Sequence, residues 1–381
     1  MPKTDILFDA SPMVDSQKTG VGYYVDHLMK SIGQHYGQNV SITGYYFDFL
    51  GLNRKKPPYA ENINFQKIWV VPGKLLSLCR RLGFQPFLEF FIPKKSRVTL
   101  FTNYVALPQI NKGLNSVFIY DLSFLDYPEF IKEENLKFLK KFCPPSILEA
   151  DSIVTISEFT KGRIKHYFPN IKAPIIVAPI PPQEIKNKRL PLSKNLRYMG
   201  ISPNKYILFM GTIEPRKNID TLVKGYAWLD KNIRDNYALV IAGGNGWKNE
   251  QTLENISKLK EEGLNIILTG YVTDKEKNFL YSNASVFVLP SHYEGFGMHI
   301  YEAMQFDIPV ILSDIPVFHE VASDSALYFA KDNPRDLSRK IEKILNDSGL
   351  RSELIEKSKE SLNKYSWEEN ARILYELILK K

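Results

Sequence analysis

The chain has 381 residues, of which 44% are hydrophobic and 24% charged, and this composition excludes an intrinsically disordered protein. The length exceeds what one hydrophobic core usually organises, so we expect two domains. No run of about 18 apolar residues occurs, which excludes a membrane-spanning helix, and the N-terminal residues do not read as a signal peptide.

The net charge of +8 is unevenly distributed along the chain. Residues 1–195 contain 26 Lys and Arg against 16 Asp and Glu, whereas the remainder contains 24 against 26. A basic first half indicates either a polyanionic or membrane-surface partner or an ordinary solvated surface. The two cysteines, Cys79 and Cys143, lack metal-ligand spacing, so we expect free thiols in a reducing compartment.

Short apolar runs alternate with helical patterns, which predicts βαβ units and parallel sheets. In the first half we expect strands at 5–10, 40–47, 67–71, 99–103, 116–121, 152–157 and 174–178. Five prolines within 179–204, together with the basic run 186–189, then indicate a linker between domains.

The second half repeats the alternation. We expect strands at 206–211, 238–242, 265–269, 286–290, 310–313 and 326–329, and closing helices near 334–346, 350–364 and 367–380. Two successive doubly wound α/β units fit this order.

The segment Gly211-Thr212-Ile213-Glu214-Pro215-Arg216-Lys217-Asn218 follows a predicted buried strand. Ligands in open α/β sheets sit at the carboxyl ends of strands. Arg216 and Lys217 therefore form a cationic pair suited to a diphosphate, in which Arg offers a planar fork and Lys a point charge.

Two further glycine-containing segments follow strands. Gly243, Gly244 and Gly246 lie in Ala242–Trp247, where they either admit a ligand to the backbone or serve only the turn. The segment Glu294 to Glu302 contains Phe296, Gly297 and Met298, and we expect a helix to start near Met298. Backbone N–H groups at a helix start can hold an anion, and the two carboxylates can accept hydrogen bonds from sugar hydroxyls.

The sequence has no Asp-x-Asp pair, which many sugar-nucleotide enzymes use to hold a divalent cation on the diphosphate. We therefore expect no metal and no cofactor beyond a nucleotide-sugar co-substrate. Arg216, Lys217 and the helix start would stabilise the departing diphosphate.

These motifs resemble the donor site of the retaining family-4 glycosyltransferases of the GT-B fold. The resemblance rests on "EPRKN", "GGNGW" and the Glu294–Glu302 spacing, and less specifically on the segments at Thr19–Tyr24, Tyr120–Ser123, Ser157–Thr160 and Tyr365–Glu368. It implies two Rossmann-like doubly wound domains facing across a cleft. Residues 1–180 would form the acceptor domain, 181–204 the linker, 205–364 the nucleotide-sugar domain, and 365–381 a helix crossing back to the first domain.

The resemblance also implies roles for individual residues. Arg216 and Lys217 would bind the donor diphosphate, Glu302 the ribose hydroxyls and Glu294 the transferred sugar. Gly211, Gly243, Gly244, Phe296, Gly297 and Met298 would line the donor site, and Gly20 and Gly22 would approach the phosphates from across the cleft. Transfer would retain the anomeric configuration.

The sequence departs from the family at three positions. Tyr120 stands where the family often has His, so the role of Tyr120 and Asp121 is open, since Tyr does not carry a proton near neutral pH as His does. His299 replaces a frequent Pro and either contacts ligand or serves the local structure. Asp307 replaces a frequent Gly in a turn.

The segment 73–97 mixes leucine and phenylalanine with Lys and Arg. It is either an amphipathic segment that contacts anionic lipid or a helix pair packed on the sheet with its basic groups in solvent. The first alternative favours a polyprenyl-linked glycan acceptor for a cytoplasmic enzyme that sits peripherally at the inner face of the cell membrane. No nucleic-acid module is recognised.

We therefore predict a retaining hexosyltransferase of cell-surface polysaccharide or lipopolysaccharide assembly, with GDP-mannose as the favoured donor and UDP- and dTDP-sugars as alternatives. The main alternative is a non-catalytic sugar-nucleotide-binding or scaffold protein of the same fold. An epimerase would lack the Arg216–Lys217 and Glu294–Glu302 combination. The glycines at 243, 244 and 246 do not have the G-x-G-x-x-G spacing of a nicotinamide dehydrogenase.

Overall fold

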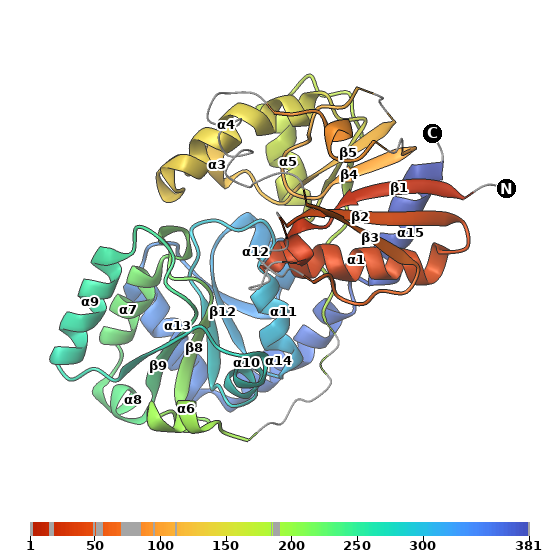
Figure 1. The fold of residues 1–381 in the computed structure, drawn as a ribbon. Coiled ribbons are helices and arrows are strands. Elements are labelled where there is room, and N and C mark those ends of the chain that lie inside the picture. The colour runs from red at the N-terminus through yellow and green to blue at the C-terminus, as the bar shows by residue number, and fades with distance from the viewer. Residues whose placement is uncertain are drawn as a thin grey trace. The chain divides into compact units, whose positions relative to one another are not determined.

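The structure is a computed structural model that describes residues 3–14, 19–48, 50, 56–69, 85–93, 96–110, 113–183, 185 and 191–379, without the side chains of the last two. The chain divides into two compact units, which Figure 1 shows as separate sets of strands and helices. Unit 1 comprises Met1–Ile180 and Tyr365–Lys381, and unit 2 comprises Pro181–Lys364.

Unit 1 is built on a parallel sheet in the order β3-β2-β1-β4-β5-β6-β7. Its strands are β1 (Thr4–Asp9), β2 (Val40–Phe47), β3 (Ile63–Ile68), β4 (Val98–Phe101), β5 (Leu114–Ile119), β6 (Ser152–Thr155) and β7 (Ile175–Val177). The order reverses between β1 and β4, which is the doubly wound arrangement expected from the sequence.

Helices cover this sheet. They are α1 (Gly20–Tyr36), α3 (Ser123–Asp126), α4 (Glu133–Leu148), α5 (Glu158–Tyr167) and α15 (Trp367–Leu379), with short 3₁₀ helices η1 (Ser11–Met13), η3 (Leu88–Phe90) and η4 (Pro128–Phe130).

The final helix α15 packs on α1, although the two are separated by more than 300 positions along the chain. Tyr36 and Tyr375 stack with ring centroids 3.9 Å apart, and Ser31 donates a hydrogen bond to the Trp367 carbonyl at 3.0 Å. Asn370, which is buried, donates to the Pro179 carbonyl at 2.6 Å. These contacts place the C-terminal helix in unit 1.

Unit 2 repeats the plan with a six-stranded parallel sheet in the order β10-β9-β8-β11-β12-β13. Its strands are β8 (Tyr206–Met210), β9 (Ala238–Ala242), β10 (Ile266–Gly270), β11 (Val286–Leu289), β12 (Val310–Ser313) and β13 (Ala326–Phe329). Its helices are α6 (Lys194–Tyr198), η5 (Pro215–Lys217), α7 (Ile219–Ala227), α8 (Lys231–Asn236), α9 (Glu250–Glu261), α10 (Asp274–Ser282), α11 (Met298–Gln305), α12 (Pro316–Ala322), α13 (Pro334–Asn346) and α14 (Ser348–Leu362).

The local sequence explains these elements. Every residue of β8, β9, β11 and β12 is buried, as expected for continuous apolar runs in a sheet covered on both faces. Helix α13 begins with Asn333 as its N-cap, whose side chain accepts from the Asp336 N–H. Leu337, Ile341 and Ile344 then recur at helical spacing and are fully buried against the sheet.

The predicted fold class of two parallel-sheet α/β units is confirmed, while one predicted strand was misplaced and one short helix was not predicted. Strand β3 is Ile63–Ile68, not 67–71. It has one strand neighbour and includes Asn64, Gln66 and Lys67, so it lacks the apolar run by which buried strands are recognised. The segment predicted as linker contains helix α6, which is capped by Ser193 and buries Leu196.

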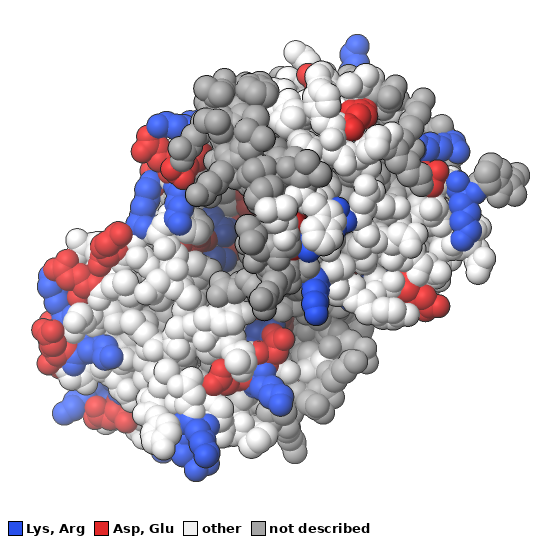
Figure 2. All heavy atoms as spheres, in the orientation of Figure 1, with Lys and Arg blue, Asp and Glu red and all other residues white. Residues whose placement is uncertain are grey.

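The basic surplus of the first half lies entirely outside the described residues. Among described positions in 1–195 there are 14 Lys and Arg and 14 Asp and Glu, so twelve of the 26 basic residues fall outside. Figure 2 shows charges of both signs interspersed on the described surface of the face it presents. Most of the predicted lipid-binding segment 73–97, with Cys79, also lies outside the described residues, whereas Cys143 is a buried free thiol.

Candidate functional site

Three loops meet at the carboxyl edge of the sheet of unit 2. Strand β8 lies between β9 and β11, and the strand order reverses between β8 and β11. The loop after β8 carries Arg216 and Lys217, the loop after β9 carries Gly243 and Gly244, and the loop after β11 carries Glu294. A reversal of strand order at this edge is where open α/β sheets bind ligands.

The loops after β8 and β11 are joined by a buried group of charges. The Lys217 ammonium lies 2.5 Å from Glu294 Oε1, and Arg216 Nη1 lies 2.8 Å from Glu294 Oε2. Ser291 also donates to Glu294 Oε1 at 2.8 Å. The side chains of Lys217 and Glu294 are only 10% and 8% exposed, so these charges interact more strongly than a surface pair would.

Arg216 is held from a second side by Glu214, whose Oε1 accepts from Arg216 Nη2 at 2.8 Å. The sequence motif contains Glu214, but nothing in its spacing marked it as a partner of Arg216. The left-handed backbone of Asn218, with φ 53°, ends η5 and starts α7, which leaves Arg216 and Lys217 in the turn between strand and helix.

Glu294 is ionised throughout the neutral and mildly acidic range. Burial acts to raise the pKa of its carboxyl, but the charges of Lys217 and Arg216 and the hydrogen bonds from Lys217 and Ser291 outweigh burial and lower the pKa to about 2. Glu294 therefore acts as a fixed acceptor beside two fixed cations.

The second carboxylate, Glu302, lies on α11 in a separate network. Lys277 donates to Glu302 Oε1 at 3.0 Å, while Tyr281 and His299 Nδ1 contact Oε2 at 2.9 Å and 2.7 Å. Burial acts to raise the pKa of Glu302, but His299 and Lys277 lower the pKa to about 2. His299 thus has a structural contact within its own helix turn, which was one of the two alternatives left open by the sequence.

Lys277 and Tyr281 were not anticipated, because they are one turn apart on α10 and belong to no recognised motif. Burial and the Glu302 charge raise the pKa of Tyr281 well above its usual range, so its hydroxyl remains a donor to Glu302. The contacts with Lys277 and Tyr281 therefore hold the Glu302 carboxylate in one orientation on α11.

The start of α11 is formed as predicted at Met298. Gly297 has φ 96°, and a Cβ there would lie 2.9 Å from Phe318 Cε1, so the turn requires glycine. The ring of Phe296 is 2% exposed and packs edge-to-face on Tyr301, so only the backbone of Phe296 is available to a ligand.

The two glycine loops pair with each other through the backbone. Gly211 N–H donates to the Ala242 carbonyl at 2.9 Å, and Ile213 N–H donates to the Gly244 carbonyl at 3.0 Å. Gly211 and Gly243 have φ of 149° and 150°, and a Cβ on Gly243 would lie 1.9 Å from the Gly211 carbonyl oxygen. Because Gly243 has no side chain, the two loops can approach each other closely.

We expect Gly243→Ala to lower the free energy of unfolding by at least about 3 kcal/mol, because a backbone carbonyl cannot yield to the added methyl. Gly244→Ala is the matched control, since a Cβ there meets nothing within 4 Å. Urea unfolding of the three proteins measures the difference. Equal stability of the two variants would show that the loops do not approach in this way.

The predicted site residues of unit 1 lie at the start of α1 and before α3. Gly20 and Gly22 belong to the first turn of α1, after the extended Thr19, so they form a helix start and not a free loop. Asp121 accepts hydrogen bonds from the Ser123 N–H and hydroxyl at 2.9 Å and 2.7 Å, which fixes the turn before α3.

Tyr120 is 5% exposed, and its hydroxyl donates to the Thr102 carbonyl at 2.8 Å. Its ring packs edge-to-face on Tyr24 and Tyr104, at centroid distances of 5.8 Å and 5.6 Å. Burial, with the nearby Tyr24 and Asp9, raises the pKa of Tyr120 well above its usual range. In this arrangement Tyr120 is a packing residue of unit 1.

Tyr120→Phe should therefore cost about 1 kcal/mol of stability, the worth of one hydrogen bond, and leave turnover within about twofold of wild type. Thermal unfolding and steady-state kinetics test the two parts separately. A loss of kcat of about 100-fold at unchanged melting temperature would instead assign the hydroxyl to the reaction.

Comparison with known proteins gives a family match within unit 2. Residues 200–361 match the family described as glycosyl transferases group 1. The chain is 31% identical over 259 residues to O-antigen chain mannosyltransferase B of Escherichia coli, and the match covers 65% of this chain and 66% of that protein. It is 34% identical over 179 residues to the serotype-specific mannosyltransferase WbdA of Escherichia coli, covering 46% and 22%. The chain thus corresponds to only part of each relative's length.

Among solved structures, sucrose-phosphate synthase from Thermosynechococcus elongatus superposes with a TM-score of 0.75 over 99% of both chains, at 16% sequence identity. This similarity establishes the GT-B fold. The chain thus contains a region that matches the glycosyl transferases group 1 family, and this region lies within unit 2. Within the described part of the chain, no helix is long and apolar enough to cross a membrane.

Proposed function

We propose that the protein is a retaining hexosyltransferase that takes its sugar from a nucleoside diphosphate sugar, with GDP-mannose as the favoured donor. The observation that carries the proposal is the buried cluster of Arg216, Lys217 and Glu294 at the reversal of strand order in unit 2. The mannosyltransferase names of the relatives support the choice of sugar, and the O-antigen in one name supports a glycan or polyprenyl-linked glycan acceptor in cell-surface polysaccharide assembly.

In this proposal the cation pair binds the donor diphosphate. Among the described residues, Lys217 gives one of its three N–H donors to Glu294. A phosphate oxygen can therefore be added to Lys217 while Glu294 stays paired. As the bond to the sugar breaks, negative charge grows on the diphosphate, and cations that are already in place stabilise this charge without reorganising. The same cations do the work of a divalent metal, so we propose a metal-independent reaction.

The carboxylates orient the donor in the proposed reaction. Glu302 is ionised and fixed by Lys277, Tyr281 and His299, and it would accept hydrogen bonds from the ribose hydroxyls. Glu294 would accept from a hydroxyl of the transferred sugar. The departing phosphate would take the proton of the acceptor on the same face of the sugar, which retains the configuration.

A thermal-shift screen of the purified protein against GDP, UDP, dTDP and their sugar conjugates, with and without EDTA, tests the proposal. At 100-fold excess over the dissociation constant, specific binding adds about 2.7 kcal/mol of stability. We expect a shift from GDP that EDTA does not change and that Arg216→Ala and Glu302→Ala remove. Lys258→Ala, at a side chain that is 61% exposed, is the control and should keep the shift.

Mannose transfer is then measured with GDP-mannose. A shift without transfer or donor hydrolysis would favour the alternative of a non-catalytic sugar-nucleotide-binding protein. The burial of Tyr120 is the structural observation that supports this alternative. A shift from UDP alone would overturn the choice of donor. No shift from any nucleotide would overturn the donor site itself.

A further inference from the structure

A fourth loop of unit 2, which follows β13, contacts the two loops that carry Lys217 and Glu294. It contains Asp332, whose Oδ1 accepts a hydrogen bond from Asn218 Nδ2 at 3.0 Å and lies 3.1 Å from His292 Nδ1. Asn218 directly follows Lys217 in the chain, and His292 precedes Glu294 by two positions. One carboxylate oxygen therefore joins the loops after β8, β11 and β13.

Asp332 lies in a turn that is fixed on both sides. The Asn333 N–H donates to the Ala330 carbonyl at 3.0 Å, and the Ala330 N–H donates to Asp336 Oδ2 at 2.8 Å. Asn333 caps α13, and this helix packs on α7, which starts directly after Asn218. The backbone of Asp332 is left-handed, with φ 65°, a conformation that Asp adopts more readily than most residues. The turn therefore holds the carboxylate in a fixed place.

The contacts of Asp332 act on the backbone that carries the cation pair. Asn218 is 6% exposed and has a left-handed backbone, a conformation that is retained where neighbouring contacts fix it. A buried amide donor is also costly to leave without an acceptor, and Asp332 supplies one. On the other loop, the His292 N–H donates to the Arg216 carbonyl at 2.9 Å. The carboxylate thus restrains the chain immediately after Lys217 and the residue that binds the Arg216 backbone.

We propose that Asp332 is a positioning residue for Arg216 and Lys217, and that it acts through Asn218 and His292. A side chain that is held in place before a ligand arrives avoids the loss of affinity that ordering it on binding would cause. The carboxylate does not bind the diphosphate itself, because two anions repel each other. The inference rests on the proposed function, since it takes the cation pair as the site of the donor diphosphate.

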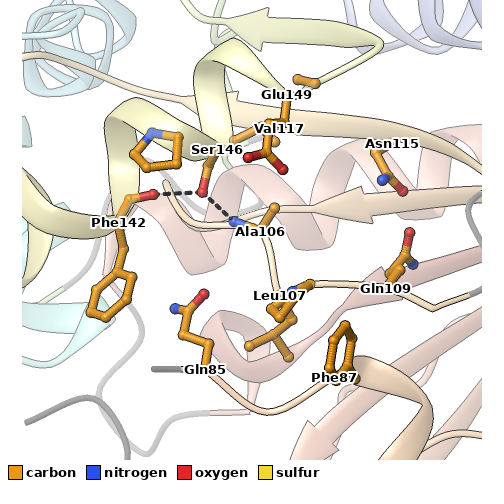
Figure 3. A pocket seen from close by; sticks show the side chains of 13 residues that line it. Gln85, Phe87, Ala106, Leu107, Gln109, Asn115, Val117, Phe142, Ser146 and Glu149 are labelled. Carbon is orange, nitrogen blue, oxygen red and sulfur yellow. Dashed lines mark hydrogen bonds between the residues drawn. The ribbon is translucent and has the colours of Figure 1, made fainter. Parts of the chain in front are cut away.

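The described lining of the pocket in unit 1 does not suit a diphosphate. This pocket has a volume of about 380 Å³ and lies between α4, η3 and the connection from β4 to β5 (Figure 3). None of its thirteen described lining residues is Lys, Arg or His, and Glu149 adds an acidic group. A phosphate buried there would have no cation beside it, which is costly. A gain in affinity from a second phosphate therefore indicates the cation pair of unit 2.

Isothermal titration calorimetry of the full chain with GDP and GMP, and in parallel with UDP and UMP, tests the proposal. The ratio of the two affinities measures what the second phosphate adds to binding, whereas a general disturbance of the site lowers both affinities alike. We expect Asp332→Ala to weaken binding of the diphosphate about fivefold and binding of the monophosphate less than about twofold. Asp332→Asn should keep the wild-type ratio, because both contacts go to Oδ1 and an amide oxygen can replace it.

Asp324→Ala is the matched control for Asp332→Ala. Asp324 lies before β13, at the opposite end of the strand that Asp332 follows, and its side chain is 73% exposed. This variant should bind both nucleotides as the wild type does. Urea unfolding establishes that each variant is folded.

The outcomes separate this inference from the proposed function. A wild-type ratio in Asp332→Ala, or an equal loss of affinity for diphosphate and monophosphate, would overturn the positioning role and leave the donor site in place. Binding by Asp332→Asn as weak as that by Asp332→Ala would also overturn it, because the acceptor oxygen would then not be what Asp332 supplies. A wild-type protein that binds no nucleotide would overturn the donor site and this inference together.

Discussion

Lys217→Met is expected to lower the free energy of unfolding by about 3 kcal/mol and to abolish nucleotide binding. The substitution keeps an unbranched side chain, one heavy atom shorter, but leaves Glu294 buried with one cation in place of two. Removing one member of a buried ion pair is costly because the remaining charge keeps its desolvation penalty. Urea unfolding and the GDP thermal shift measure the two effects.

The double variant Lys217→Met with Glu294→Gln separates stability from binding. It should recover most of the lost stability, because no charge is left without its partner, but it should not recover nucleotide binding. Lys224→Met, at an exposed position on α7, is the control and should match wild type in both measurements. A double variant no more stable than Lys217→Met would contradict the buried pair.

The second large effect is a loss of stability in acid. Glu294 and Glu302 have folded-state pKa values lowered from 4.5 to about 2. The stability they supply is therefore complete above pH 4.5 and is lost as the pH falls toward 2. Each carboxylate contributes about 3 kcal/mol over this window.

Urea unfolding of the wild type and of Glu294→Gln and Glu302→Gln at pH 7, 5, 4 and 3 measures this contribution. The variants should be less stable at pH 7 and should lose less stability on acidification. Glu356→Gln, at a side chain that is 73% exposed, should follow the wild-type curve. If the two buried-site variants instead fall in parallel with wild type below pH 4.5, other groups carry the acid sensitivity.

Apart from β3, every predicted strand has bounds within two residues of those in the structure. The strands at 40–47, 238–242, 310–313 and 326–329 have the predicted bounds in the structure. Strand β3 was misplaced because its exposed edge position does not require the apolar run on which the prediction depended. The short helix α6 was missed because prolines and polar residues around it favour a linker.

The sequence predicted those residues of the candidate site that belong to local motifs. Arg216, Lys217 and Glu294 were singled out because each lies in a loop that directly follows a buried strand. Their mutual contact, however, follows from the adjacency of β8 and β11, which are separated by β9 and β10 along the chain. The sequence therefore indicated the residues, whereas the order of the strands in the sheet brings them into contact.

The sequence by itself determined the fold class and the positions of the motifs that follow β8, β9 and β11, because hydrophobic periodicity and glycine turns are local properties. The tertiary structure alone decided that Gly243 lies where two backbones approach closely, that Lys277 and Tyr281 orient Glu302, and that Tyr120 packs in unit 1. It alone placed Asn218 and His292 beside one oxygen of Asp332. These features depend on contacts between residues far apart in the chain, which packing fixes and local sequence does not encode.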